Sequence, residues 1–154
     1  MPRNIQTASL LLAFQQDLES LLQVTPSSIL VFELDGKILG ANDAAADLLN
    51  DSVNTLAGKN IFEIFKLDDG LFETQVLQLA ETHDGFSFEG LFHGRTIFCF
   101  LYPIANERGS ILRIGLIAQD NTDRRRAEEQ VRTLTLELDR KVRDRTAELQ
   151  AANV

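Results

Sequence analysis

The chain has 154 residues, of which 44% are hydrophobic and 25% are charged, a balance that indicates a folded domain and excludes wholesale disorder. Its apolar runs are too short to cross a bilayer, and the single cysteine, Cys99, can form neither an internal disulfide nor a thiolate metal site. The net charge is −8, and residues 1–122 hold 16 of the 23 acidic but only 7 of the 15 basic side chains, so nucleic-acid binding by this part is disfavoured. We expect a cytoplasmic protein without a membrane segment.

Residues 1–24 are predicted to form an N-terminal amphipathic helix. Its apolar residues alternate spacings of three and four, which places them on one face: Leu11, Phe14, Leu18 and Leu21. Pro26 ends the helix because proline pushes the residue before it out of the α region. Two interpretations stay open, since this face can pack on its own domain or pair with the same helix of a second copy.

Residues 25–120 are predicted to form one domain that mixes strands and helices. Strands are expected at residues 29–32, 37–41, 86–92, 95–103 and 111–119. Asp35-Gly36 is a signal for a two-residue hairpin between the first two strands, and Asn42 is expected to cap the helix that follows. Helices are expected between the two strand clusters, at residues 43–49, 61–65 and 68–82. Helices grouped in this way indicate an α+β domain with an antiparallel sheet.

Residues 121–154 contain no Gly or Pro and are predicted to form one long helix, capped by Asp120 or Thr122. An apolar stripe follows this helix and is made by Ala127, Val131, Leu134, Leu138, Val142 and Leu149. Several members are eleven residues apart, and a repeat of about 3.67 residues per turn gives a nearly straight stripe. An isolated helix is marginal in water, so the stripe needs a partner. A second copy is the simplest one, and the sequence predicts a coiled coil.

Four stretches of the sequence resemble parts of a PAS domain and of the helix that follows it. Residues 35–45, DGKILGANDAA, resemble the opening hairpin and the Asn that begins the first helix. Residues 109–119 resemble the last strand, and residues 120–125, DNTDRR, resemble the Asp-x-Thr junction by which that strand enters a signalling helix. Residues 140–149, RKVRDRTAEL, are similar to the linker before the kinase core of many bacterial sensor histidine kinases. The resemblance implies a five-stranded sheet with helices on one face.

The resemblance also implies which side chains form a ligand pocket. Facing the helices, the candidate pocket residues are Phe62, Phe65, Phe72, Val76, Cys99, Leu101, Ile114 and Leu116. Phe98, Phe100 and Ile117 then lie on the opposite face of the sheet. Because both faces are apolar, we expect both to be covered, the outer one by the N-terminal helix of the same or a second copy. Cys99 and the Phe cluster are more often ordinary core, so the presence of a ligand stays open.

Asp120 and Thr122 form the predicted signal junction. Each side chain can accept a hydrogen bond from the unpaired N–H groups of the first helical turn, and the Asp120 carboxylate also complements the positive helix end. We expect the junction to set the angle at which the long helix leaves the sheet.

The resemblance narrows the choice of cofactor without naming one. Residues 58–63 lack the cysteine of the light-sensing flavin subtype, which excludes cysteinyl-flavin photochemistry. His83 is the candidate for a haem ligand, but its place at the end of a helix favours a capping role. The chain has no Trp, so one common flavin-stacking side chain is also missing. The cofactor is therefore unknown, and both a colourless small-molecule ligand and no ligand at all stay open.

The sequence contains no motif for catalysis or metal binding. We therefore expect a module that is not an enzyme in itself, with any histidine kinase activity outside this chain. The resemblance implies a sensory module, and the two apolar stripes predict that it pairs as a parallel homodimer through both terminal helices. It would transmit a signal through the coiled coil to an effector, a two-component histidine kinase. A ligand-free protein-interaction module and a haem- or flavin-binding redox or gas sensor are the alternatives.

Overall fold

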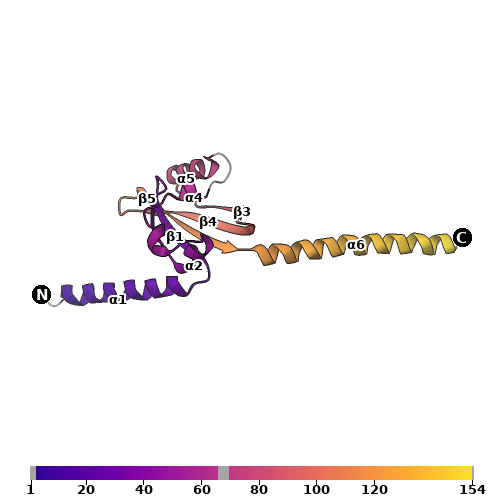
Figure 1. Ribbon diagram of the computed structural model, residues 1–154, viewed down its shortest axis with the longest axis horizontal. Coiled ribbons are helices and arrows are strands. Elements are labelled where there is room, and N and C mark those ends of the chain that lie inside the picture. Colours follow the sequence, from indigo (N-terminus) through magenta and orange to yellow (C-terminus); the bar gives the residue numbers. More distant parts are fainter. Residues whose placement is uncertain (1–2, 66–69, 154) are drawn as a thin grey trace.

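The computed structural model describes residues 3–65 and 70–153, with side chains from residue 8 onward. In chain order the elements are α1 (Arg3–Val24), β1 (Ser28–Glu33), β2 (Ile38–Ala41), α2 (Asp43–Leu48), α3 (Val53–Leu56), α4 (Ile61–Ile64), α5 (Leu71–Thr82), β3 (Phe86–Phe92), β4 (Arg95–Ala105), β5 (Ile111–Asp120) and α6 (Thr122–Ala152). Figure 1 shows α1 and α6 at opposite ends of a central domain, each directed along the long axis of the molecule. The predicted strands and both terminal helices are present.

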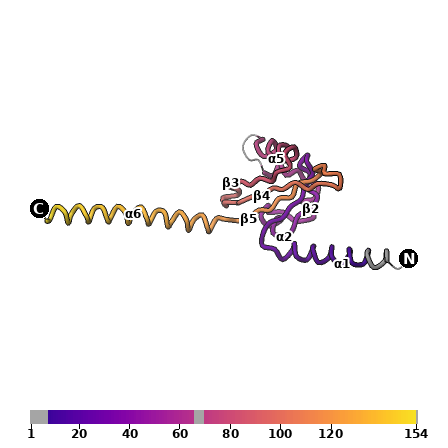
Figure 2. Tube along the Cα trace, turned by 180° about the vertical axis from the view of Figure 1, so that it is seen from behind, coloured from indigo at the N-terminus to yellow at the C-terminus, as the bar shows by residue number. Residues whose placement is uncertain are grey.

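The five strands form one antiparallel sheet in the order β2-β1-β5-β4-β3. The first and last strands are neighbours, because β1 pairs with β5 from Ser28 opposite Ala118 to Glu33 opposite Arg113. In Figure 2, α6 continues the path of β5 out of the sheet. The α+β fold with an antiparallel sheet is therefore confirmed.

One hydrophobic core joins the sheet to the helices α2–α5, which places these helices on one face, as predicted. Its buried members are Leu30, Phe32, Ile38, Ala46, Leu56, Ile61, Phe65, Phe72, Val76, Leu79, Ile97, Cys99, Leu101, Ile114, Leu116 and Ala118. Alternate residues of β4 and β5 belong to this core because successive side chains of a strand point to opposite faces.

The hairpin between β1 and β2 is confirmed, but its loop is longer than predicted. Glu33 N donates to Lys37 O at 2.9 Å, and Gly36 N donates to Glu33 O at 2.8 Å, so three residues rather than two form the loop. Gly36 closes it with φ of 90°, the left-handed conformation that follows a type I turn in a three-residue hairpin.

The helices agree with prediction in type and differ at their ends. Asn42 caps α2 as predicted, with its side chain accepting from Ala45 N at 3.0 Å. The short helix α3 was not predicted; Ser52 and Thr55 cap each other at its start. The predicted start of α5 at Asp68 and Asp69 lies outside the described residues.

The helix α1 is attached to the domain at its C-terminal end through Asn42. The side-chain amide of this buried residue donates to Leu22 O of α1 at 2.9 Å and to Ser27 O at 3.0 Å. Its oxygen accepts from Ile29 N at 2.9 Å in addition to the α2 cap. Asn42 thus fixes the end of α1 against β1 and α2.

Candidate functional site

The junction between β5 and α6 is held by hydrogen bonds of Asp120 and Thr122. Asp120 Oδ1 accepts from Thr122 N at 2.9 Å and from the Thr122 hydroxyl at 2.5 Å. Asn121 occupies the position before the helix, and its side chain makes no capping hydrogen bond. Asp120 therefore satisfies the first free N–H of α6, from the last residue of β5.

Thr122 has a different role from the one expected of a cap. Its hydroxyl oxygen accepts from Thr96 N of β4 at 2.9 Å, and Asn121 N donates to Thr96 O at 2.8 Å. The prediction that Thr122 accepts from a first-turn N–H is therefore wrong. The reason is geometric, because β4 runs beside the end of β5 and offers an unpaired backbone N–H there. The start of α6 is thus tied to two strands.

Charged side chains add two contacts at this junction. The hydrogen bonds from Thr122, with a smaller contribution from the Arg95 guanidinium, hold the pKa of Asp120 below its usual range. Arg125 Nη2 of α6 lies 2.6 Å from Glu89 Oε1 of β3, and this contact raises the pKa of the Arg125 guanidinium. The sequence analysis missed Glu89 and Arg125. The strand alternation that places Glu89 on the outer face was the one signal available.

The candidate pocket residues lie together in the core. Val76, Cys99, Leu101, Ile114, Leu116, Phe65 and Phe72 are buried, and Phe62 packs against them. The Phe72 ring centroid lies 5.7 Å from that of Phe62 and 5.9 Å from that of Phe65, so the rings contact one another. Burial raises the pKa of the Cys99 thiol to about 12, so this thiol stays protonated at neutral pH. Phe72 also lines a groove of about 350 Å³ between α5 and β3.

His83 lies at the C-terminal end of α5, as the cap interpretation expects. It adopts a left-handed φ of 62°, and its N–H donates to Leu79 O at 2.9 Å. Its two ring nitrogens lie 3.2 Å from Glu81 O and 3.2 Å from Gly109 O. His83 therefore connects the end of α5 to the turn between β4 and β5. Within residues 3–65 and 70–153, no group of His, Cys, Asp and Glu side chains could hold a metal ion.

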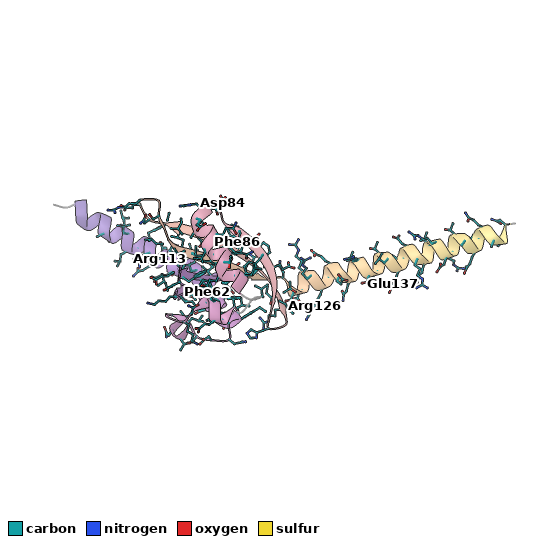
Figure 3. The ribbon with its side chains drawn as sticks, turned by 90° about the horizontal axis from the view of Figure 1, so that it is seen from above. Phe62, Asp84, Phe86, Arg113, Arg126 and Glu137 are labelled. Carbon is teal, nitrogen blue, oxygen red and sulfur yellow. The ribbon has the colours of Figure 1, made fainter. Side chains whose placement is uncertain are left out.

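The apolar residues predicted for dimerisation are exposed. On α1 they are Leu11, Phe14, Leu18 and Leu21, and on α6 they are Ala127, Val131, Leu134, Leu138, Val142 and Leu149. Figure 3 shows the side chains of α6, Glu137 among them, projecting from a helix that no other element accompanies. Over the described part of the chain, no helix has the length and apolar character needed to cross a membrane.

The outer face of the sheet is not covered by the α1 of the same chain. Phe98 and Phe100 are 36% and 42% exposed, and Ile117 beside them is half-buried. The Tyr102 ring lies across Gly115, where a Cβ would meet its atoms at 2.1–2.5 Å. Of the two covers considered from the sequence, the one within a single chain is therefore wrong, because Phe98 and Phe100 stay exposed with α1 in place.

Comparisons with known proteins identify the fold. The sequence profile of the PAS fold family matches residues 22–126. Curated protein sequences contain no match to the chain. Among solved structures, the PAS domain of an HTR-like protein from Haloarcula marismortui is 22% identical, with a TM-score of 0.63 over 75% of this chain and 98% of that one.

Two further structures are similar to a comparable extent. The PAS domain of BvgS from Bordetella pertussis is 21% identical, with a TM-score of 0.57 over 81% of this chain and 98% of that one. A sensory box sensor histidine kinase from Vibrio cholerae is 20% identical, with a TM-score of 0.54 over 78% of this chain and 98% of that one. At these identities the likeness concerns the fold.

Proposed function

This chain belongs to the PAS fold family, and from that premise we propose that it is a cytoplasmic sensory and dimerisation module whose α6 transmits a signal to a two-component histidine kinase. The observation that carries the proposal is the exposed apolar stripe of α6. This helix leaves the sheet at a junction that is hydrogen-bonded to β5 and β4 and joined by an ion pair to β3. The similarity to a sensor histidine kinase from Vibrio cholerae supports the choice of effector. The kinase domain would lie outside this chain.

The two terminal helices support a parallel homodimer. α1 runs towards the domain and α6 runs away from it, both along the long axis of the molecule (Figure 1). A single two-fold axis along that direction would therefore pair α1 with α1 and α6 with α6. The α6 stripe would bury Val131 and Leu138, which are 64% and 60% exposed in one chain. Burial of such side chains is the main favourable term in association.

The outer face of the sheet is the second surface that this dimer would cover. α1 presents a wide apolar face, since Leu10 and Leu12 are exposed in addition to the predicted stripe. We propose that the partner's α1 packs over Phe98 and Phe100, which would remove an exposed apolar patch from water. Deletion of residues 1–24 should then cause aggregation or misassembly. An unchanged melting temperature and full solubility of the deletion variant would contradict this cover.

Transmission would follow the bonds of the junction. A change in the inward residues of β4 and β5 would move Thr96 and Asp120, which hold the first residues of α6. Because Glu89 of β3 holds Arg125 one turn further along, a shift of the sheet would rotate or tilt the helix as a unit. Paired stripes with eleven-residue spacing can answer such a rotation by changing their packing register.

Two measurements test the dimer: its mass, and whether its two chains run parallel. Light scattering at tens of micromolar, where a moderate coiled coil associates, should give twice the mass of one chain. In a parallel dimer Leu138→Cys should form a disulfide between two chains, since residue 138 meets its own copy. The control is Asp139→Cys, whose side chain points about 100° away around the helix. A monomer, or equal cross-linking of the two variants, would overturn the proposal.

The packed core favours a second candidate, a module that binds partners and holds no small ligand. The contact of the Phe72 ring with Phe62 and Phe65 supports this candidate. Absorption spectroscopy separates it from the sensor alternatives: a Soret band would indicate haem, flavin bands would indicate flavin, and a featureless spectrum would leave native mass spectrometry to detect a colourless ligand.

A further inference from the structure

The edge strand β3 has unpaired backbone groups on the side away from β4. Leu91 lies opposite Thr96, and the N–H and C=O of Thr96 are bonded on the other side of β4, to Thr122 and Asn121. Backbone groups alternate in direction along a strand, so every second residue of β3 faces outward. The outward residues are Ser87, Glu89 and Leu91. Among the described residues, no strand pairs with this side.

A groove follows this open edge, and α5 forms its other wall. One part, of about 350 Å³, is lined by Phe72 and Gln75 of α5 and by residues 88–91 of β3. A second part, of about 400 Å³, is lined by Gln75 and Gln78 of α5 and by residues 84–87. Gln75 borders both parts, which therefore form one groove along β3. An extended chain in this groove would lie where a sixth strand of the sheet belongs.

The groove has a defined chemical character. Of the residues that line the two parts of the groove, Asp84 and Glu89 are acidic and none is Lys or Arg. Glu89 also pairs with Arg125 of α6, so Asp84 is the lining carboxylate that has no ion pair among the described residues. Figure 3 shows Asp84 and Phe86 at the end of α5 where β3 begins. Apolar side chains also border the groove, since Leu71 and Leu91 are 55% and 71% exposed. An occupant therefore needs apolar side chains and positive charge.

We propose that the β3 edge binds an extended segment of a partner protein as an added strand, with apolar residues alternating with Lys or Arg. The main-chain groups of Ser87, Glu89 and Leu91 would bond the segment, and alternate apolar side chains would enter the groove beside α5. A second copy of β3 is disfavoured as the occupant. It contains no basic residue to meet Asp84, and antiparallel self-pairing about Glu89 would bring together two glutamates that each already pair with the Arg125 of their own chain. The proposal does not depend on the dimer of the terminal helices.

Amide hydrogen exchange of the full chain, with and without a probe peptide, tests this edge. The probe is acetyl-Lys-Val-Lys-Ile-Thr-Val-Lys-amide, and its control replaces each Lys by Glu. In the free protein the amides of Ser87, Glu89 and Leu91 should exchange fast, while those of Phe88 and Gly90 are protected by β4. Saturating probe should slow the three outward amides by about tenfold and leave the other two unchanged. The Glu peptide should have no effect.

A proline variant provides the matched test. Ser87→Pro removes one outward N–H without removing a bond to β4, and proline is tolerated at such edge positions. Ser87→Ala keeps the N–H and should bind the probe like the wild type, whereas Ser87→Pro should weaken binding by about tenfold. Equal binding by both variants would overturn the proposal. So would outward amides whose protection rises with protein concentration in the absence of peptide, because a second copy would then occupy the edge.

Discussion

The domain and the long C-terminal helix use the same apolar residue types in opposite ways. Leu101 of β4 is fully buried by its own chain, whereas Leu138 of α6 is 60% exposed. The domain can bury its apolar side chains because sheet and helices form two layers with one core between them. A single helix has no second layer. The difference indicates that the domain buries its own apolar side chains, whereas the apolar stripe of α6 stays exposed in a single chain.

The domain and α6 meet at the junction, where hydrogen bonds and an ion pair hold them together. Asp120 and Thr122 are joined by hydrogen bonds, and Arg125 and Glu89 by an exposed ion pair. Exposed ion pairs contribute about 0–1 kcal/mol to stability. Such contacts therefore fix the direction of α6 but add little to the free energy of unfolding, so they can be rearranged without unfolding the domain.

The largest expected effect compares one leucine from each region. Leu101→Ala should lower the free energy of unfolding of the domain by about 2–5 kcal/mol, because it leaves a cavity in a closed core. Leu138→Ala should leave that free energy unchanged and weaken the dimer. Urea unfolding followed by the NMR intensities of β4 and β5 amides measures the first quantity, and light scattering over a dilution series measures the second. Similar losses of domain stability in both variants would break the comparison.

The sequence predicted the parts of this comparison that depend on local pattern. Strand alternation predicted β3 to β5, and the absence of Gly and Pro predicted α6. The four-residue α3 is too short to show a helical period, and only the Ser52 and Thr55 capping box could have indicated it. The contact of Glu89 with Arg125 joins exposed residues 36 positions apart, and no local pattern encodes such a pair.

The extra loop residue after β1 has a similar explanation. Asp35-Gly36 is compatible with a two-residue and a three-residue hairpin, because glycine accepts the left-handed conformation in both. Only the register of β1 against β2 and β5 decides between them, and that register depends on the whole sheet. The candidate pocket residues show the same limit. Local patterns of apolar residues predict that they lie in the core, whereas the presence of a ligand depends on how the whole domain packs.

The attachment of α1 gives the next largest effect. Asn42→Ala should lower the free energy of unfolding by about 2–3 kcal/mol, since it removes the α2 cap and leaves buried backbone groups unpaired. Asn42→Ser is the control, because its hydroxyl can still cap α2 but cannot reach Leu22 O. The serine variant should lose about half as much. Both variants should speed amide exchange in the last turn of α1. Protected α1 amides in Asn42→Ala would show that α1 is held by other contacts.

The outer face of the sheet gives a smaller effect. A Cβ at Gly115 would meet the Tyr102 ring at 2.1–2.5 Å, so Gly115→Ala should displace the ring and cost about 1–2 kcal/mol. At Gly40, on the edge strand β2, a Cβ meets nothing within 4 Å, so Gly40→Ala should change stability by less than about 0.5 kcal/mol. In a Tyr102→Ala background the cost of Gly115→Ala should disappear. If it persists, the Tyr102 ring is not its cause.

The smallest effect on stability concerns Asp120 and is the sharpest test of the junction. Asp120→Ala should cost about 1 kcal/mol, the usual value of a helix cap. Because hydrogen bonds from Thr122 lower the pKa of Asp120 in the folded state, its carboxylate stabilises the fold above the ordinary pKa of 3.8 and loses this effect as the pH falls through the lowered value. The stability difference between wild type and variant should therefore be constant near neutral pH and shrink in acid.

The same variant separates a plain cap from a transmitting one. A plain cap predicts that Asp120→Ala alters stability alone and leaves the direction of α6 unchanged. The transmission proposal predicts that α6 also loses its fixed direction, because Asp120 and Thr96 together hold the first residue of the helix. Spin labels on β4 and on the middle of α6 should then give a broader distance distribution at neutral pH, and the wild type should approach it in acid. An unchanged distribution in the variant would leave Asp120 as a cap, and the route from sheet to helix would then run through the hydrogen bonds of Thr96 or the ion pair of Arg125 and Glu89.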